Sequence, residues 1–163
     1  MILGSHINFD TVMITRPNGK TDVLGRIEDV VSIFGENVFE EILCAHVIEH
    51  FYPQDAMNVL KDCLKILRPG GKLIVEAGCI QGQIEMYVAK HPWFINNGGI
   101  KQFIMSIFGQ DKHAWKELGW HHWGYTGDTM AEVMESCGYK IVHKGIGRTH
   151  GMGKRDFRVE GIK

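Results

Sequence analysis

The chain has 163 residues, of which 44% are hydrophobic and 23% charged, and its formal net charge at pH 7 is −1. This length and composition are typical of one globular domain, so we expect a single domain over residues 1–163. The near-neutral charge argues against a nucleic-acid partner and against an anionic membrane surface. No leader pattern and no run of eighteen apolar residues is present, which predicts a cytoplasmic protein without a membrane partner. The four cysteines lack metal-type spacing and are interpreted as reduced core residues, whereas the oligomeric state is not set by the sequence.

The first part of the chain contains short segments with β-strand character. Thr11–Thr15 is rich in β-branched residues and precedes a Pro-Asn-Gly turn, so we expect a strand there. Thr21–Gly25 predicts a further strand. The apolar residues of 27–34 then recur at helical spacing, which predicts a short helix that ends at Gly35.

The central stretch, residues 41–76, predicts a strand, a helix and a second strand. Ile42–Ala45 is a short apolar run of the kind that a buried strand needs. After Pro53, the apolar residues of 56–67 recur at helical spacing, and Pro69-Gly70-Gly71 ends this helix. The apolar run Leu73–Val75 follows. Two strands joined by a helix in so few residues indicate a right-handed parallel crossover.

The segment that follows the crossover predicts two helices and an unusual loop. Gln83–Lys90 is interpreted as a helix, and the apolar stripe of Ile100–Phe108 as a helix face that belongs to the core. Gly109–Gly127 holds three tryptophans and three histidines without a clean period. We expect either a lid over a substrate pocket or a surface loop pinned by its tryptophans, and the sequence favours neither.

The C-terminal part predicts one helix and two strands. Thr126 is a candidate N-cap for a helix that Gly138 ends. Tyr139–His143 and Phe157–Ile162 are interpreted as strands that form an antiparallel hairpin at the edge of the sheet. The glycines between these strands are spaced too irregularly for a phosphate-binding loop.

Two motifs of the central stretch resemble those of a known enzyme family. His46-Val47-Ile48-Glu49-His50-Phe51 and the later Pro69-Gly70-Gly71 are similar to the HVLEHF and RVLKPGG motifs of class I S-adenosylmethionine-dependent methyltransferases of type 11. The resemblance implies an α/β fold, a Rossmann-like three-layer sandwich. Its sheet would be mostly parallel with a C-terminal antiparallel hairpin, and its N-terminus shortened. It also implies methyl transfer to a small-molecule acceptor, with S-adenosylmethionine as cofactor and S-adenosylhomocysteine as product.

The resemblance assigns cofactor contacts by position. The first loop would contact the methionine and ribose parts, the end of the second strand the ribose, and the segment after the third strand the adenine. Ala45 and His46 would border the methionine end. The residues so assigned are Gly4, Ser5, His6, Ile14, Arg26, Ile27, Ala45 and His46. No metal site is implied.

Three positions depart from the family pattern. His6 stands where a glycine is usual, Met13 stands near the place of a ribose-binding carboxylate, and Arg26 follows Gly25 where the family has aspartate. These departures favour an alternative hypothesis, a non-catalytic binding or assembly protein with a degenerate cofactor loop.

Three residues are candidates for the chemistry. The resemblance places His46 as the candidate base, and His122 and Tyr125 of a His-Trp-Gly-Tyr-Thr segment as candidates on the acceptor side. His46 to His50 also spells the H-x-x-E-H motif of inverted zinc peptidases. That chemistry needs both histidines on one face of a helix, whereas the helical pattern begins only after Pro53, so zinc hydrolysis ranks well below methyl transfer.

Overall fold

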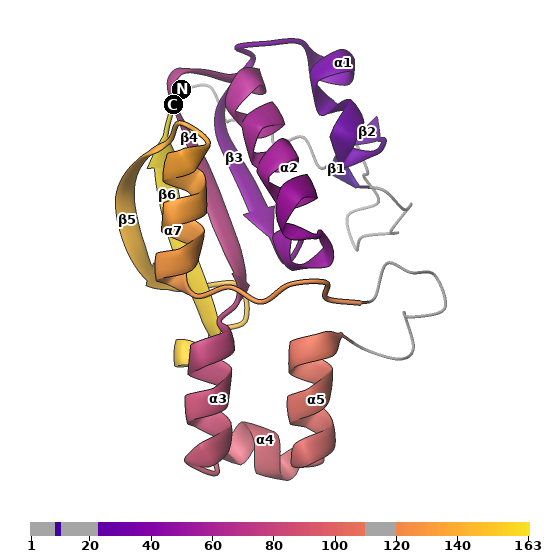
Figure 1. Ribbon diagram of the computed structural model, residues 1–163, viewed down its shortest axis with the longest axis vertical. Coiled ribbons are helices and arrows are strands. Elements are labelled where there is room, and N and C mark those ends of the chain that lie inside the picture. Colours follow the sequence, from indigo (N-terminus) through magenta and orange to yellow (C-terminus); the bar gives the residue numbers. More distant parts are fainter. Residues whose placement is uncertain (1–8, 11–22, 110–119) are drawn as a thin grey trace, which may run out of the picture.

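The computed structural model describes residues 9–10, 23–109 and 120–163, and these residues form two sheets (Figure 1). A small parallel sheet pairs two strands, β1 (Phe9–Asp10) and β2 (Val23–Leu24). The main sheet has the spatial order β3 (Phe39–Ala45), β4 (Leu67–Gly78), β6 (Asp156–Ile162) and β5 (Lys140–Ile146). β3 and β4 are parallel, whereas β6 is antiparallel to both of its neighbours. The expected α/β fold with a Rossmann-like mixed sheet is confirmed.

The described helices connect these strands in chain order. They are η1 (Ile27–Asp29), α1 (Val30–Phe34), η2 (Ile48–His50), α2 (Pro53–Ile66), α3 (Ile80–Val88), α4 (Pro92–Asn96), α5 (Ile100–Phe108), α7 (Gly127–Ser136) and η3 (Gly153–Arg155). As predicted, the helical segment after residue 27 ends at Gly35, whose φ of 79° is a conformation that glycine adopts readily. Thr126 caps α7 as expected, because its hydroxyl accepts a hydrogen bond from the Thr129 amide.

The expected crossover is formed by β3, α2 and β4. Pro53 occupies the first position of α2, and Lys65 lies in its last turn near the negative end of the helix dipole. β4 begins at Leu67, earlier than the predicted strand, and includes the Pro-Gly-Gly turn. A Cβ atom at Gly71 would lie 2.8 Å from the Arg68 carbonyl oxygen, which explains a glycine there.

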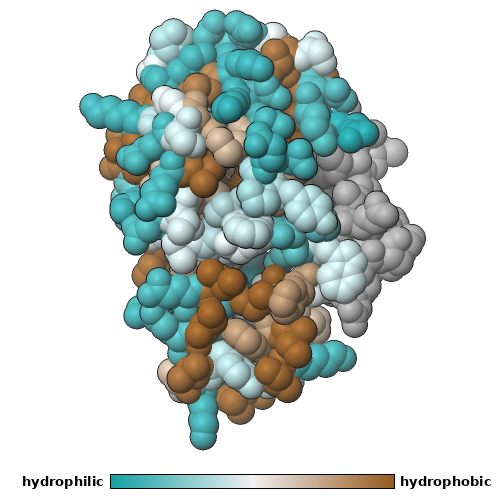
Figure 2. All heavy atoms as spheres, viewed as in Figure 1, coloured by the Kyte–Doolittle hydropathy of each residue, from teal (hydrophilic) through white to brown (hydrophobic). Residues whose placement is uncertain are grey.

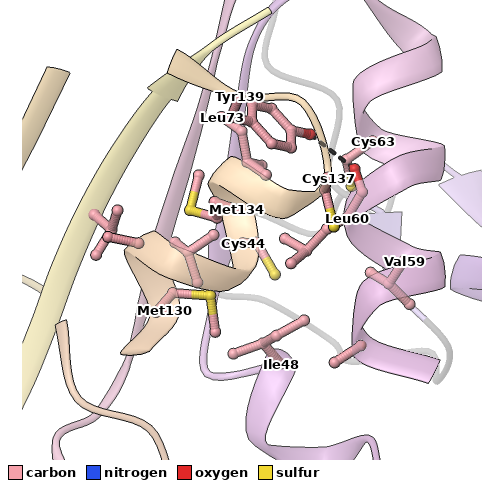
Figure 3. Close-up of a cluster of buried hydrophobic side chains, with 14 of the residues drawn as sticks. Cys44, Ile48, Val59, Leu60, Cys63, Leu73, Met130, Met134, Cys137 and Tyr139 are labelled. Atoms are coloured by element: carbon pink, nitrogen blue, oxygen red, sulfur yellow. Dashed lines mark hydrogen bonds between the residues drawn. The ribbon is translucent and has the colours of Figure 1, made fainter. Parts of the chain in front are cut away.

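The hydrophobic core lies between one face of the main sheet and two helices, α2 and α7 (Figures 1 and 3). Alternate residues of the strands point toward it: Leu73, Val75 and Ala77 on β4 and Phe157 and Val159 on β6. Three free cysteines, Cys44, Cys63 and Cys137, are buried in this core, and Cys79 is partly exposed.

The other face of the sheet carries charged side chains. Arg158 donates from Nη1 to Glu76 Oε1 at 2.5 Å and from Nε to Glu160 Oε1 at 2.6 Å. Lys72 continues this row, with its Nζ 3.1 Å from Glu160 and 3.0 Å from Glu41. The expected three-layer sandwich would have a second layer of helices on this face. Among the described residues, this row of charged side chains lies there.

One buried hydrogen bond ties the C-terminal strands to α2. The Tyr139 hydroxyl donates to the Leu60 carbonyl oxygen at 2.8 Å (Figure 3). Since a net buried hydrogen bond is worth about 1 kcal/mol, we expect Tyr139→Phe to lower the free energy of unfolding by about that amount. Tyr125→Phe is the matched control, because the buried Tyr125 hydroxyl has no hydrogen-bond partner among the described residues. Urea unfolding of both variants measures the difference, and equal losses would contradict this account.

Helices α3, α4 and α5 extend beyond the sheet as a separate unit (Figure 1). α3 begins three residues earlier than predicted, because the Cys79 sulfur accepts from the Gly82 amide and caps the helix. The sequence interpretation missed α4. The assignment of the α5 stripe to the core is wrong: α5 has no buried residue, and Ile100, Ile104 and Phe108 are exposed. Figure 2 shows the resulting apolar surface on this unit.

Candidate functional site

The segments that follow three strands meet at one edge of the main sheet. β3, β4 and β5 all end at this edge, and β6 begins there because it runs antiparallel to β4 and β5. The His46 amide donates to the Glu76 carbonyl oxygen at 2.8 Å, and the Cys79 amide donates to the Arg155 carbonyl oxygen at the same distance. This carboxyl edge is where open α/β sheets bind ligands.

His46 is the first residue after β3 and adopts an unusual backbone conformation. Its φ is 55°, which costs a residue with a Cβ atom roughly 1 kcal/mol or more and is typical of functional positions. Its Nδ1 lies 3.2 Å from Glu49 Oε1 and its Nε2 lies 4.0 Å from Asp156 Oδ2. The His46 side chain is 24% exposed.

The charges around His46 and Glu49 reinforce each other. Burial by itself lowers the pKa of His46, but the hydrogen bond to Glu49 and the negative charges of Glu49 and Asp156 raise it overall. Burial raises the pKa of Glu49, whereas the hydrogen bond from His46 and the neighbouring imidazoles lower it overall. The pair therefore favours a charged carboxylate beside an imidazole that binds protons readily.

A second histidine lies against His46. The rings of His46 and His150 are 4.3 Å apart, and His150 Nδ1 is 2.8 Å from Asp156 Oδ2. Glu76 holds the loop that carries His150, because its Oε2 accepts hydrogen bonds from the amides of Arg148 and Thr149 and from the Thr149 hydroxyl. The charged row behind the sheet thus positions a side chain at the carboxyl edge.

The described end of the aromatic loop is fastened to η2 and α3. The amides of His122 and Trp123 donate to the Glu49 carbonyl oxygen at 2.8 and 3.3 Å. The His122 ring stacks on Tyr52 with centroids 4.5 Å apart, and the Ile80 amide donates to the Tyr125 carbonyl oxygen. These contacts hold residues 120–125 against the site, while residues 110–119 of the expected lid lie outside the described residues.

Buried polar atoms without a protein partner gather at this edge. In the described ranges they are His46 Nε2, Glu49 Oε2, Gln83 Oε1, Tyr125 Oη, Arg155 Nε and Asp156 Oδ1. Arg155 Nε and Asp156 Oδ1 approach each other, but at 3.6 Å they are too far apart for a hydrogen bond. Because a buried polar group without a partner is costly, this gathering indicates a place where a ligand binds.

A cavity of about 240 Å³ opens beside Glu49. Its walls come from η2, the start of α3, the end of α5 and the aromatic loop. The lining residues are Glu49, Gly78, Ile80, Gln83, Ser106, Ile107, Phe108, His121, His122, Trp123 and Gly124. It therefore combines an apolar wall with a carboxylate and two histidines.

The structure brings the three candidate catalytic residues around Glu49. His46 bonds its carboxylate, and His122 bonds its backbone and lines the cavity. Tyr125 is buried, and burial together with the Glu49 charge raises the pKa of its hydroxyl. Their roles remain predictions.

The predicted cofactor contacts divide between described and undescribed residues. Gly4, Ser5, His6 and Ile14 lie outside the described residues. Ala45 and His46 lie at the carboxyl edge as expected.

The adenine-side segment is formed by Arg26 and Ile27. The Arg26 side chain is 77% exposed and its Nη2 lies 3.4 Å from Glu28 Oε1, while Ile27 packs against the core. Glu28 also lines a groove of about 420 Å³ along α2. The Glu28 carboxylate therefore lies near this segment, although residue 26 is an arginine where the family has aspartate.

The geometry of an inverted zinc peptidase is not formed. His46 precedes η2, which is only three residues long, and the two motif histidines join different clusters. His46 groups with His150 and Asp156, whereas His50 groups with Glu49 and His121.

Sequence reasoning missed several residues of the site. Glu49 stands inside the quoted motif, where its tie to His46 could have been inferred from their spacing. Asp156, His150 and His121 gave no comparable signal, because only the tertiary fold brings their loops to the edge.

Comparisons with known proteins also indicate a similarity to methyltransferases. A family model described as a methyltransferase domain matches residues 2–75, somewhat less than half of the chain. The resemblance to methyltransferases is confirmed. No protein with a curated description gives a significant match to this methyltransferase-like chain.

Solved methyltransferases share the fold of this methyltransferase-like chain at low sequence identity. An S-adenosylmethionine-dependent methyltransferase from Archaeoglobus fulgidus aligns with a TM-score of 0.55 and 11% identity, covering 86% of this chain and 66% of that one. The 1,6-didemethyltoxoflavin-N1-methyltransferase of Burkholderia thailandensis, with bound 1,6-didemethyltoxoflavin and S-adenosylhomocysteine, gives 0.54 and 14%, covering 86% and 49%. The small RNA methyltransferase HEN1 gives 0.53 and 16%, covering 84% and 15%. The chain thus spans two thirds or less of the length of these proteins.

The comparisons and the helices bear on the expected partners. One of these neighbours was solved with a small molecule and another is named for small RNA, so the expected lack of a nucleic-acid partner remains a prediction. Among the described helices, none combines the length and apolarity that crossing a membrane requires.

Proposed function

We propose that this chain is an S-adenosylmethionine-dependent methyltransferase that acts on a small-molecule acceptor. The observation that carries the proposal is the set of unpartnered polar atoms around His46 at the carboxyl edge of a methyltransferase-like sheet. The methyltransferase-domain match over residues 2–75 supports it.

The described residues suit the methionine end of the cofactor. A sulfonium is a cation, and two buried carboxylates, Glu49 and Asp156, flank His46 at this edge. Ala45 has a small side chain there, and the turn at His46 follows it directly. The fit at the first loop falls on residues outside the described ranges.

The chemistry that follows needs only one proton-accepting group from the protein. Bound S-adenosylmethionine would supply an electrophilic methyl group to an acceptor oxygen or nitrogen, with S-adenosylhomocysteine as the product that would leave. His46 receives the proton that the acceptor loses, through Nε2, the ring nitrogen for which the described residues offer no hydrogen-bond partner. Glu49 orients the ring through Nδ1 and stabilises the imidazolium that forms.

The cavity wall favours an acceptor with an apolar or aromatic part. Ile107, Phe108 and Trp123 form its apolar surface, while His122 and Glu49 offer polar contacts. Such a mixture of apolar walls and few polar groups is typical of small-molecule pockets.

Calorimetric titration of the full chain with S-adenosylhomocysteine tests the proposal. We expect saturable binding of one ligand per chain. Ala45→Leu should weaken this binding by placing bulk at the methionine end, whereas Ala89→Leu, an exposed position at the end of α3, should not. If the unmodified chain does not bind S-adenosylhomocysteine, the proposal is wrong and the hypothesis of a non-catalytic binding protein is favoured.

A further inference from the structure

A cluster of potential metal ligands borders the cavity. Glu49, His50 and His121 each offer one ligand atom, and these atoms lie within 4.8 Å of one another. Glu49 and His121 also line the cavity, so any ion held here would face the space proposed for the acceptor.

Both imidazoles of this cluster are oriented by backbone carbonyl groups. His50 Nδ1 lies 2.9 Å from the Trp120 carbonyl oxygen, and His121 Nδ1 lies 3.2 Å from the Ile107 carbonyl oxygen. A carbonyl oxygen only accepts, so each Nδ1 must carry the proton and donate it. With the proton on Nδ1, the Nε2 lone pair of each ring is the one that a metal ion can bind, which is the usual arrangement of metal-binding histidines.

The buried carboxylate of Glu49 is an independent indication of a cation site. The Glu49 side chain is only 5% exposed and its Oε1 bonds His46, whereas its buried Oε2 finds no hydrogen-bond partner in the part of the chain that the structure describes. A buried carboxylate oxygen without a donor is costly, and a bound cation would satisfy it.

We propose that Glu49, His50 and His121 bind a divalent transition-metal ion. Two imidazoles and one carboxylate suit Zn²⁺, Fe²⁺, Co²⁺ or Mn²⁺ better than Mg²⁺ or Ca²⁺, which prefer all-oxygen sites. Three protein ligands leave positions open toward the cavity, where an acceptor oxygen could bind the ion and lose its proton more easily. The metal site stands independently of the methyl-transfer proposal.

The neighbouring cluster of His46, His150 and Asp156 is less suited to a cation. Asp156 Oδ2 already pairs with His150 at 2.8 Å, and the Arg155 guanidinium nitrogen Nε lies 3.6 Å from Asp156 Oδ1. This positive charge opposes a second cation, whereas no lysine or arginine pairs with Glu49 among the described residues.

Cobalt binding to the metal-free full chain tests the proposal. The chain is dialysed against a chelator and titrated with Co²⁺, whose visible absorption reports imidazole and carboxylate coordination, and elemental analysis gives the stoichiometry. We expect one ion per chain, displaced by Zn²⁺. His121→Gln should weaken binding at least about tenfold, since even outer-shell changes cost 10–100-fold. His143→Gln, an exposed position on β5, is the matched control and should bind as the unmodified chain does.

Two further variants distinguish metal binding at the Glu49 cluster from metal binding at the His46 cluster. His50→Gln repeats the test if His121→Gln does not fold, as judged by circular dichroism. His150→Gln examines the other cluster: an ion lost there but kept in His121→Gln and His50→Gln would overturn the proposal, as would no Co²⁺ binding by the unmodified chain. Titration of the same metal-free chain with S-adenosylhomocysteine reports on methyl transfer separately, so either proposal can fail alone.

Discussion

His46→Asn is expected to slow methyl transfer by about 10²–10⁴-fold, the range that removal of a general base typically costs. Asparagine tolerates the left-handed backbone conformation that His46 adopts, with φ of 55°, so the turn should persist. Its amide cannot accept the acceptor proton in the place of Nε2. The rate of S-adenosylhomocysteine formation with an acceptor found by screening is the measurement.

The control separates loss of the base from loss of the site. S-adenosylhomocysteine binding by His46→Asn should stay within a few fold of the unmodified chain, because the side chain acts on the acceptor proton. His143→Asn, on exposed β5, should leave both quantities unchanged. A rate for His46→Asn within tenfold of the unmodified chain would show that another group, or water, accepts the proton.

Glu76→Gln is expected to lower the free energy of unfolding at pH 7 by about 3 kcal/mol, the lower end of the cost of breaking a buried ion pair. The Glu76 side chain is 2% exposed and Arg158 10%, so the guanidinium would lose its closest buried partner. The loop amides of Arg148 and Thr149 would also lose a charged acceptor. Urea unfolding measures the effect, and Glu132→Gln on the exposed side of α7 should change stability by no more than about 0.5 kcal/mol.

The difference in the free energy of unfolding between the unmodified chain and Glu76→Gln should depend on pH. Burial by itself raises the pKa of Glu76, but hydrogen bonds from Thr149, the Arg158 guanidinium and the Arg148 amide lower it to about 2. Because this folded-state pKa lies below the ordinary value of 4.5, the unfolded chain binds the proton more tightly. The stabilisation is thus fully present above pH 4.5 and is lost as the pH falls toward 2. If the stability difference stays constant between pH 4.5 and pH 2, the charge of Glu76 is not its source.

The sequence by itself determined most of the local elements and the resemblance to methyltransferases. Helical spacing over residues 56–67 and the apolar runs on either side were enough to predict the crossover of β3, α2 and β4, because periodicity reports which faces are buried. The same stretch carried the motifs behind the methyltransferase resemblance. It also placed His46 at the carboxyl edge, since a residue that follows a parallel strand must lie there.

Amphipathic pattern alone misled the interpretation of α5. Its apolar stripe was assigned to the core, yet Ile100, Ile104 and Phe108 are exposed on the unit formed with α3 and α4. A stripe shows that a helix has an apolar face, but not whether the rest of the fold supplies a surface to cover it.

Only the tertiary structure decided what surrounds His46. β6 inserts between β4 and β5, and this brings Asp156 to the edge where β3 and β4 end. The loop held by Glu76 brings His150 there, and the segment pinned to Glu49 brings His121 beside His50. These residues are about 70 to 110 positions apart from their partners in the chain. Local periodicity carries no information about contacts at such separations, because they depend on strand order and on which loops pack together.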